Sequence, residues 1–292
     1  MGTTGMIDKG EARAAIQALF EGWAENAVTA EDAISPELAG LAMFEAPIVG
    51  FASAGDPLFD DFKGPGAIGP WHMGPGEWLP GAATVVSLFF PFTEAVRRSN
   101  VRGSLDEPSP EWLHARIEGQ RAIGAFTGGL RRWAEGRGAR CCAPSIDERF
   151  RSFDAGRGLE DRPEATERTF GSNWSERHAA YVCGLGTFGL SKGIITERGM
   201  AGRFTSAIVD ARIEPDARPY DGLYDRCIRC GACVRRCPVG AISMEDGKDH
   251  VLCSRWVEES KVRHAPRYGC GKCQTGVPCE ASDPSVGRAT IS

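Results

Sequence analysis

The chain has 292 residues, of which 42% are hydrophobic and 25% charged, and its formal net charge is -5. This composition is typical of a globular protein of one or two domains and excludes an intrinsically disordered chain. No apolar run approaches the roughly 20 residues that a membrane helix needs. The first eight residues lack the basic and apolar regions of an export signal, so we expect a cytoplasmic protein without membrane contact.

The first third of the chain predicts two helix starts and one strand. Asp8, followed by apolar side chains at helical spacing, predicts a helix over residues 8–27. Ser35, followed by proline and glutamate, predicts a second helix start. A short β-rich run predicts a strand over residues 47–51.

The clearest strand and helix signals follow. Residues 84–90 form a continuous β-rich run between glycine and proline, which predicts a central strand buried on both faces. Ser109 and the proline after it begin the longest predicted helix, which extends to about residue 133. Residues 139–144 are a further predicted strand. It carries Cys141 and Cys142, for which we expect buried packing, because adjacent cysteines rarely form a disulfide.

A glycine-rich turn follows a predicted helix over residues 175–183. Its glycines are Gly184, Gly186 and Gly189. They match the spacing of a dinucleotide-binding loop, but that loop must follow a strand and open a helix, so this function is excluded. Glycines let the backbone approach a neighbour closely, and that neighbour is either a strand or a cofactor. A strand over residues 204–209 and a linker over 215–221 complete this part of the chain.

Eight of the 11 cysteines lie in the C-terminal part of the chain. Four form the run C-x2-C-x2-C-x3-C-P, which is typical of bacterial ferredoxins: Cys227, Cys230, Cys233 and Cys237. In two-cluster ferredoxins the fourth cysteine of such a run binds the other cluster, so a second group of ligands is required. The chain supplies four more thiols, namely Cys253, Cys270, Cys273 and Cys279.

We therefore predict two 4Fe-4S clusters with crossed ligands. Set 1 consists of Cys227, Cys230, Cys233 and Cys279, and set 2 of Cys237, Cys253, Cys270 and Cys273. A disulfide framework is the first alternative, but a chain of this length buries its own core. Zinc is the second, but four-thiolate zinc sites usually contain two C-x2-C pairs. Nearby basic residues can offset the clusters' negative charge, or mark a nucleic-acid patch: Arg229, Arg235, Arg236 and Lys272.

Taken together, the glycine turn and the cysteines resemble the epoxyqueuosine reductase superfamily, which includes the reductive dehalogenases. The resemblance covers roughly residues 84–279. Its matching residues are Arg177, Ala179, Ala180, Gly184, Leu185, Gly186, Gly189, Asp210, the run from Cys227 to Pro238, Cys253, Cys270, Cys273 and Gln274. It implies an α/β (mixed α+β) core domain with a central sheet flanked by helices, over residues 1–218. A small bacterial-ferredoxin-like domain follows over residues 219–292.

Three departures from the family pattern limit what the resemblance implies. Cys279 follows Cys273 after five residues and precedes glutamate, where these reductases have C-x2-C-x3-C-P. Residues 170–173 contain no carboxylate, where the family has a proton-donating aspartate ahead of the turn. Leu190 and Ser191 replace the Lys-Asn pair that follows the family's last turn glycine. We therefore do not expect tRNA-borne epoxyqueuosine to be the substrate.

Two classes of function fit these observations. As an enzyme of the resembled family, the protein would be a cobalamin-dependent reductase that holds a corrinoid against Gly184, Gly186 and Gly189 and acts on a small molecule. Its electrons come from a reduced ferredoxin or flavodoxin-type donor. The candidate proton donors are Tyr181, His178 and Glu176. The alternative for each is a core residue with a satisfied hydroxyl (Tyr181), a surface helix residue (His178) and a first-turn acid that balances the helix dipole (Glu176). Alternatively, the protein is a ferredoxin-type electron-transfer partner without its own catalytic site.

Overall fold

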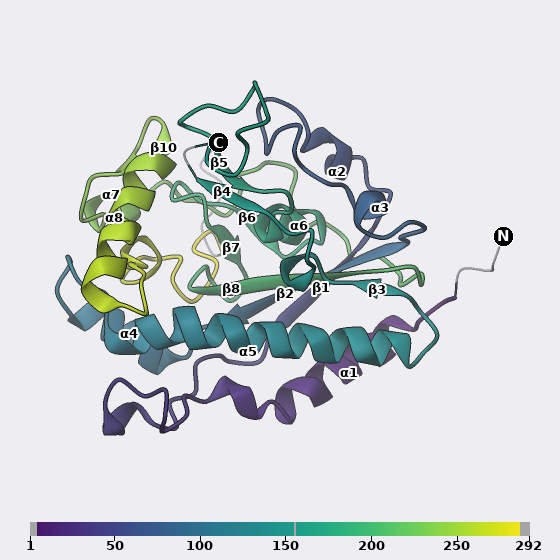
Figure 1. Cartoon of the computed structure of the whole chain (residues 1–292), viewed down its shortest axis with the longest axis horizontal. Helices are drawn as coiled ribbons and strands as arrows, with labels where there is room; N and C mark the ends of the chain where they lie inside the picture. The colour runs from purple at the N-terminus through teal and green to yellow at the C-terminus, as the bar shows by residue number, and fades with distance from the viewer. Residues whose placement is uncertain (1–4, 155, 287–292) are drawn as a thin grey trace.

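The computed structural model describes residues 5–154 and 156–286. Met1 to Thr4, which entered the export-signal analysis, lie outside the described residues. The core is a four-stranded antiparallel sheet with the order β1-β2-β8-β3 (Figure 1). Its strands are β1 (Ile48–Ser53), β2 (Thr84–Pro91), β8 (Gly202–Val209) and β3 (Cys141–Cys142).

Strand β2 lies in the interior of this sheet, and all its residues are buried. Val85 pairs with Ile208 of β8, and their side chains join the apolar cluster on one face of the sheet. Val86 and its partner Ala207 join the larger cluster on the other face. Because successive side chains of a strand point to opposite faces, a sheet covered on both sides requires a continuous apolar run. The predicted central strand is confirmed.

Helices cover both faces of the sheet (Figure 1). On one face lie α1 (Lys9–Glu21), α4 (Glu94–Arg102) and α5 (Pro110–Glu135), and on the other α6 (Glu176–Val182). The Ser109 hydroxyl caps α5 by accepting from the Trp112 N–H at 3.2 Å. The first helix ends at Glu21, earlier than predicted, and a 3-10 turn, η1 (Ala24–Asn26), follows. The second predicted helix start gives only the turn η2 (Pro36–Leu38).

Short elements complete the α6 side and the cysteine-rich end. The α6 side has α2 (Leu58–Asp61), α3 (Pro75–Trp78) and two hairpins, β4 (Ser152–Asp154) with β5 (Phe170–Ser172) and β6 (Gly186–Phe188) with β7 (Ile194–Thr196). The turn η3 (Pro144–Ile146) follows β3 and lies against β8 and α5. The cysteine-rich end has α7 (Ala232–Arg235), β9 (Ile242–Ser243), β10 (Gly247–Lys248), α8 (His250–His264) and η4 (Lys272–Gln274). The architecture is the predicted mixed α+β fold.

Specific contacts fix the cysteine-rich end against the sheet and its helices. The Arg267 guanidinium forms a mostly buried ion pair with Glu118 of α5, with Nε 3.0 Å from Oε2. The fully buried Lys272 ammonium donates to the Asn100 carbonyl of α4 at 2.8 Å. Within the described part of the chain, every helix is too short or too polar to cross a membrane.

Candidate functional site

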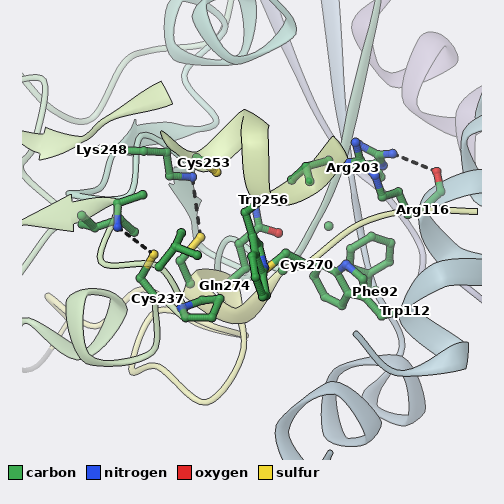
Figure 2. A pocket seen from close by; sticks show the side chains of 18 residues that line it. Phe92, Trp112, Arg116, Arg203, Cys237, Lys248, Cys253, Trp256, Cys270 and Gln274 are labelled. Carbon is green, nitrogen blue, oxygen red and sulfur yellow. Dashed lines mark hydrogen bonds between the residues drawn. The ribbon is translucent and has the colours of Figure 1, made fainter. Parts of the chain in front are cut away.

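Two cavities at the C-terminal end of the molecule are each bordered by four cysteines. A cavity of about 140 Å³ is lined by Cys237, Cys253, Cys270 and Cys273, the four residues of set 2 (Figure 2). A smaller cavity of about 20 Å³ is lined by Cys227, Cys230, Cys233 and Cys279, the four residues of set 1. The fold therefore gathers the cysteines into the two groups that the crossed spacing predicts, although they are up to 52 positions apart (Cys227 to Cys279).

Left-handed turns shape the loops that present these thiols. Gly231, between Cys230 and α7, has φ 69°, and Gly271, within the Cys270–Cys273 pair, has φ 71°. Gly271 also packs against the ring of Trp112 on α5, and a Cβ there would lie 2.0 Å from Trp112 Cζ2. Only glycine satisfies both conditions. This loop is therefore pressed directly onto α5.

The electrostatic coupling of Cys279 and Cys270 is to the other cysteines of their own sets, whereas Cys233 of set 1 also interacts with Cys273 of set 2. Burial, together with the negative charges of Cys233, Cys227 and Cys230, raises the pKa of Cys279 to about 12. Burial, together with the charges of Cys273, Cys253 and Cys237, likewise raises the pKa of Cys270 to about 11. Four thiolates can share such a buried site only when positive charge between them offsets their repulsion.

The positions of the cysteines can be compared with the two alternatives to iron–sulfur clusters, a disulfide framework and a zinc site. All 11 cysteines are free thiols. Among residues 5–154 and 156–286, His, Cys, Asp and Glu side chains nowhere gather in threes closely enough to hold one metal ion. A 4Fe-4S cubane is larger than one ion and holds its thiolates further apart.

The set 2 cavity has a polar end and an aromatic end. Lys248 Nζ lies 3.6 Å from Cys273 Sγ, and the Ala241 N–H donates to Cys237 Sγ at 3.2 Å. Burial works to lower the pKa of Lys248, but the charges of Cys273 and Cys253 outweigh it and the net shift is upward. At the far end, Arg203 donates to the Arg116 carbonyl at 2.8 Å beside aromatic rings (Figure 2). The rings belong to Phe92, Trp112 and Trp256.

The set 1 cavity is covered mainly by apolar groups. Leu190, Ile195 and Met200 line it from the core side, and the Cys279 thiol lies 3.4 Å from Met200 Sδ. The backbone N–H of Met200 also donates to the Cys279 carbonyl at 2.9 Å. The longer loop that carries Cys279 is therefore held against the turn before β8. Cys230 is the one exposed cysteine of the chain.

The glycine turn approaches the chain's own backbone. A Cβ on Gly186 would lie 2.1 Å from the Ile195 carbonyl oxygen of β7, and one on Gly184 would lie 2.6 Å from the Ala217 carbonyl oxygen. Gly189 faces the Ile195 side chain, at 3.2 Å from Cδ1. Of the two predicted reasons for these glycines, packing against a neighbouring strand accounts for Gly186. None of the three needs a corrinoid to explain its lack of a side chain.

His178 and Tyr181, two of the candidate proton donors, occupy packed positions on α6. The His178 ring lies between Phe62 and Phe188, with Nδ1 2.7 Å from Ser175 Oγ. Burial and the Arg177 charge lower the pKa of His178 to about 3, so it is neutral near pH 7 and has no imidazolium proton to donate. Tyr181 is buried against the ring of Tyr220, and burial raises its pKa.

Glu176, the third candidate, has both carboxyl oxygens buried above the sheet. They lie near Ser206 and Trp174 without a hydrogen bond of normal geometry, and the Trp174 N–H donates to the Ser206 hydroxyl at 2.8 Å. Burial raises the pKa of Glu176 to about 7 against the opposing effect of these two groups. This pKa suits proton transfer near neutral pH, but the oxygens are shielded from solvent.

We predict that Glu176 makes the protein less stable as the pH rises from about 4.5 to 7. Because its folded-state pKa lies above the ordinary 4.5, the folded state binds the proton more tightly, and that stability is lost as the carboxyl ionises. The loss is at most about 3 kcal/mol. Urea unfolding at pH 5 and pH 8 should show this difference in the wild type and a smaller one in Glu176→Gln. Glu25→Gln, at an exposed position, should behave as the wild type.

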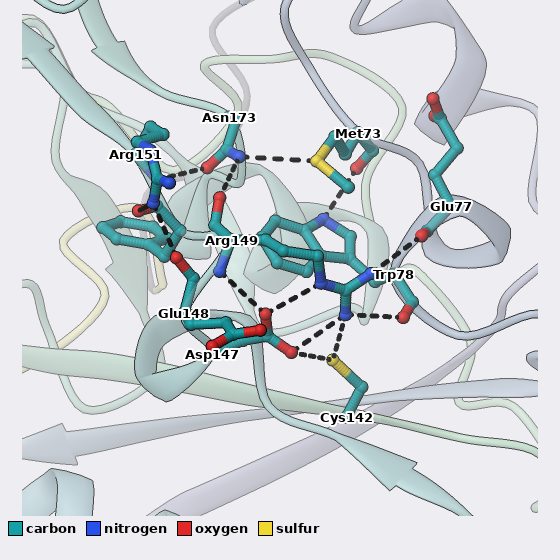
Figure 3. A network of polar contacts seen from close by, with 10 residues as sticks. Met73, Glu77, Trp78, Cys142, Asp147, Glu148, Arg149, Arg151 and Asn173 are labelled. Atoms are coloured by element: carbon teal, nitrogen blue, oxygen red, sulfur yellow. Dashed lines mark hydrogen bonds and ion pairs between the residues drawn. The ribbon is translucent and has the colours of Figure 1, made fainter.

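A polar network anchors the segment where the resembled enzymes have their aspartate (Figure 3). The Asn173 amide donates to the Arg149 carbonyl and accepts from the Arg151 N–H, both at 2.9 Å. Arg149 in turn binds Asp147, whose carboxylate accepts from the buried Cys142 thiol at 3.4 Å. Asn173 is thus a structural residue, and the predicted packing role of Cys142 is confirmed. Its neighbour Cys141 is only partly buried.

Three basic residues around the set 2 cavity were missed by the sequence analysis. Arg116 comes from α5, Arg203 from β8 and Lys248 from β10. No local motif marks them, because they meet only where the cysteine-rich end packs on the core. In the sequence, Lys248 precedes Cys253 by five positions, and this closeness is the one sign that could have linked a basic residue to set 2.

Comparisons with known proteins agree with this description. Residues 223–243 match the family model of the 4Fe-4S binding domain, which contains the cysteine run but none of the four later thiols. The structure is similar to the catabolic reductive dehalogenase NpRdhA, with 18% identity, TM-score 0.49 and coverage of 81% of this chain and 30% of that chain. It is also similar to an epoxyqueuosine reductase, with 19% identity, TM-score 0.48 and coverage of 80% and 61%.

A third similar structure is the epoxyqueuosine reductase from Bacillus subtilis, with 18% identity, TM-score 0.46 and coverage of 93% of this chain and 67% of that chain. No curated protein matches the sequence. The chain thus spans less than two thirds of the first two matched structures. The predicted resemblance to both groups of proteins is confirmed as a resemblance.

Proposed function

We propose that this protein is an iron–sulfur oxidoreductase, active in the cytoplasm. Its ferredoxin-like domain, residues 219–292, holds two 4Fe-4S clusters and passes electrons to a cofactor or substrate in the core domain, residues 1–218. The observation that carries the proposal is the gathering of the eight cysteines around two cavities, four to each. The family match at residues 223–243 supports the same chemistry.

The surrounding residues suit such clusters. Each set offers four thiolates, the ligands that 4Fe-4S clusters require. A bound 4Fe-4S cluster supplies one-electron transfer. The Ala241 N–H and the Lys248 ammonium face sulfur atoms of set 2, and mainly apolar groups line the set 1 cavity. The charge of Cys273 in set 2 contributes to the raised pKa of Cys233 in set 1. The two sets are therefore neighbours, as electron transfer between them requires.

We further propose the partners of this reaction. The donor is a reduced ferredoxin or flavodoxin-type protein and the substrate is a small molecule. A tRNA substrate is not expected, because residues 170–173 contain no carboxylate where the resembled reductases have a proton-donating aspartate, and Asn173 in this segment is a structural residue. One of the matched epoxyqueuosine reductases was solved with a tRNA stem loop, so tRNA binding to this chain is worth testing directly.

Cobalamin dependence is the finer part of the proposal, and only the resemblance supports it. The residues predicted to face a corrinoid do not fit one, because Gly184 and Gly186 lie against carbonyl oxygens of the chain itself. Adding hydroxocobalamin to the anaerobic protein and measuring its retention after gel filtration tests it, and loss of the corrinoid from the protein fraction would contradict it.

The alternative function is an electron carrier without a catalytic site. The observation that favours it is the state of the candidate proton donors, since Glu176 is shielded, His178 is neutral and Tyr181 is packed in an apolar cluster. Against it stands the size of the core domain, which is far larger than two clusters need. Reduction of cytochrome c without retention of any corrinoid would favour the carrier.

We predict that anaerobically purified protein contains about eight iron and eight inorganic sulfide per chain, because two sets of four cysteines each match one 4Fe-4S cluster. Iron and sulfide assays measure this directly. About four irons would remove one of the two centres. Zinc in place of iron, with no sulfide, would overturn the proposed function.

A further inference from the structure

We infer that the two cysteine sets hold centres of unequal reduction potential, with the higher potential at set 2 and Lys248 as its main cause. Electrons then enter at set 1 and collect at set 2, next to the core domain. This inference rests on the proposed function.

Positive charge is concentrated around set 2. Lys248 Nζ lies 3.6 Å from Cys273 Sγ in a partly buried position. Arg116 and Arg203 line the same cavity, and Arg177 is close enough for its charge to interact with Cys273 and Cys253. Within the described ranges none of these four residues forms an ion pair with a carboxylate, whereas the nearby Arg267 and Arg263 do.

Set 1 has a different environment. Arg229 is the one basic residue that lines its cavity, and this side chain is exposed and donates to the Met244 carbonyl. Arg226, next to Cys227, is neutralised by Asp283 at 3.0 Å. The remaining lining outside the cysteines is nearly all apolar or glycine. Arg229 has no carboxylate partner either, but it is exposed, so within the described residues set 1 lacks a close, unpaired cation that is shielded from solvent.

This difference in charge controls where an added electron is more stable. Reduction makes a cluster more negative, so a neighbouring cation and N–H groups facing sulfur favour the reduced form and raise the potential. The effect is larger away from solvent, where charges are screened less. Lys248 meets both conditions at set 2, and no side chain with an unpaired charge meets them at set 1 within the described part of the chain.

The solvent exposure of the cysteines indicates the direction of electron transfer between the two sets. Cys230 of set 1 is exposed at the surface, whereas the four cysteines of set 2 are partly buried and share their cavity with Trp112 and Arg203. A donor protein can therefore approach set 1 more closely. From there the electron moves to the higher potential at set 2.

The test is a redox titration of the anaerobic holoprotein followed by electron paramagnetic resonance. The wild type should show two reduction steps. Lys248→Met should lower the higher step by at least about 59 mV, which is a tenfold change in the one-electron equilibrium, and leave the lower step in place. Lys248→Arg, which keeps the charge, should stay close to the wild type. Lys261→Met, at an exposed site on α8, is the matched control.

Iron content separates the possible failures. If the wild type holds fewer than eight irons, the result contradicts the proposed function, on which this inference rests. If it holds eight and both centres reduce at one potential, or if Lys248→Met moves neither step, the inference is wrong. Should Lys248→Met lose iron, Arg116→Met provides the second test, because it removes another cation from the same cavity and should lower the same step.

Discussion

Cys237→Ser and Cys233→Ser should each abolish a different iron–sulfur centre, although the two residues are only four positions apart. Cys237 lines the set 2 cavity and Cys233 the set 1 cavity, so each substitution removes one ligand from one set. We expect each variant to retain about four irons and to lose one of the two signals in the paramagnetic resonance spectrum of the reduced protein. The retained signal should differ between the variants.

Cys183→Ser is the matched control for this experiment. Cys183 is fully buried in the core beside β2 and lines neither cavity, so this variant should keep about eight irons and both signals. If Cys237→Ser and Cys233→Ser lose the same signal, the crossed assignment is wrong. A result in which either variant keeps all eight irons would exclude that cysteine as a ligand.

Glu118→Ala should reduce the free energy of unfolding by about 3–5 kcal/mol, the cost of leaving one charge of a buried ion pair without its partner. Glu118 accepts from Arg267 Nε with both carboxyl oxygens, at 3.1 and 3.0 Å, and also contacts the buried His114 at 3.0 Å. Its loss would free the Arg267 segment from α5. Urea unfolding of the anaerobic protein, followed by cluster absorbance and by circular dichroism, measures the change.

The pair of Arg98 with Glu94 on α4 is the control. Both side chains are largely exposed, at 62% and 67%, so Arg98→Ala should change the unfolding free energy by less than about 1 kcal/mol. Equal effects of Glu118→Ala and Arg98→Ala would show that the Arg267 contact does not hold the cysteine-rich end to the core. Early loss of cluster absorbance in Glu118→Ala, before the core unfolds, would support that role further.

The sequence determined the elements whose signals are local. The run over residues 84–90 predicts a strand covered on both faces, and β2 is that strand, because its alternating side chains enter apolar clusters on opposite faces of the sheet. Ser109 and its proline mark the start of α5, because capping depends only on neighbouring residues. The cysteine spacing predicts the two sets, since ferredoxin ligand order follows from chain geometry.

Only the tertiary structure decided what depends on distant partners. The glycine spacing could not distinguish a cofactor from a strand as the neighbour of Gly186, and the fold places the Ile195 carbonyl there. Lys248 and Arg203 come to the set 2 cavity from different strands, and burial moves the pKa of Glu176 to about 7. Such contacts and burial arise from packing between segments far apart in the chain, which no local pattern records.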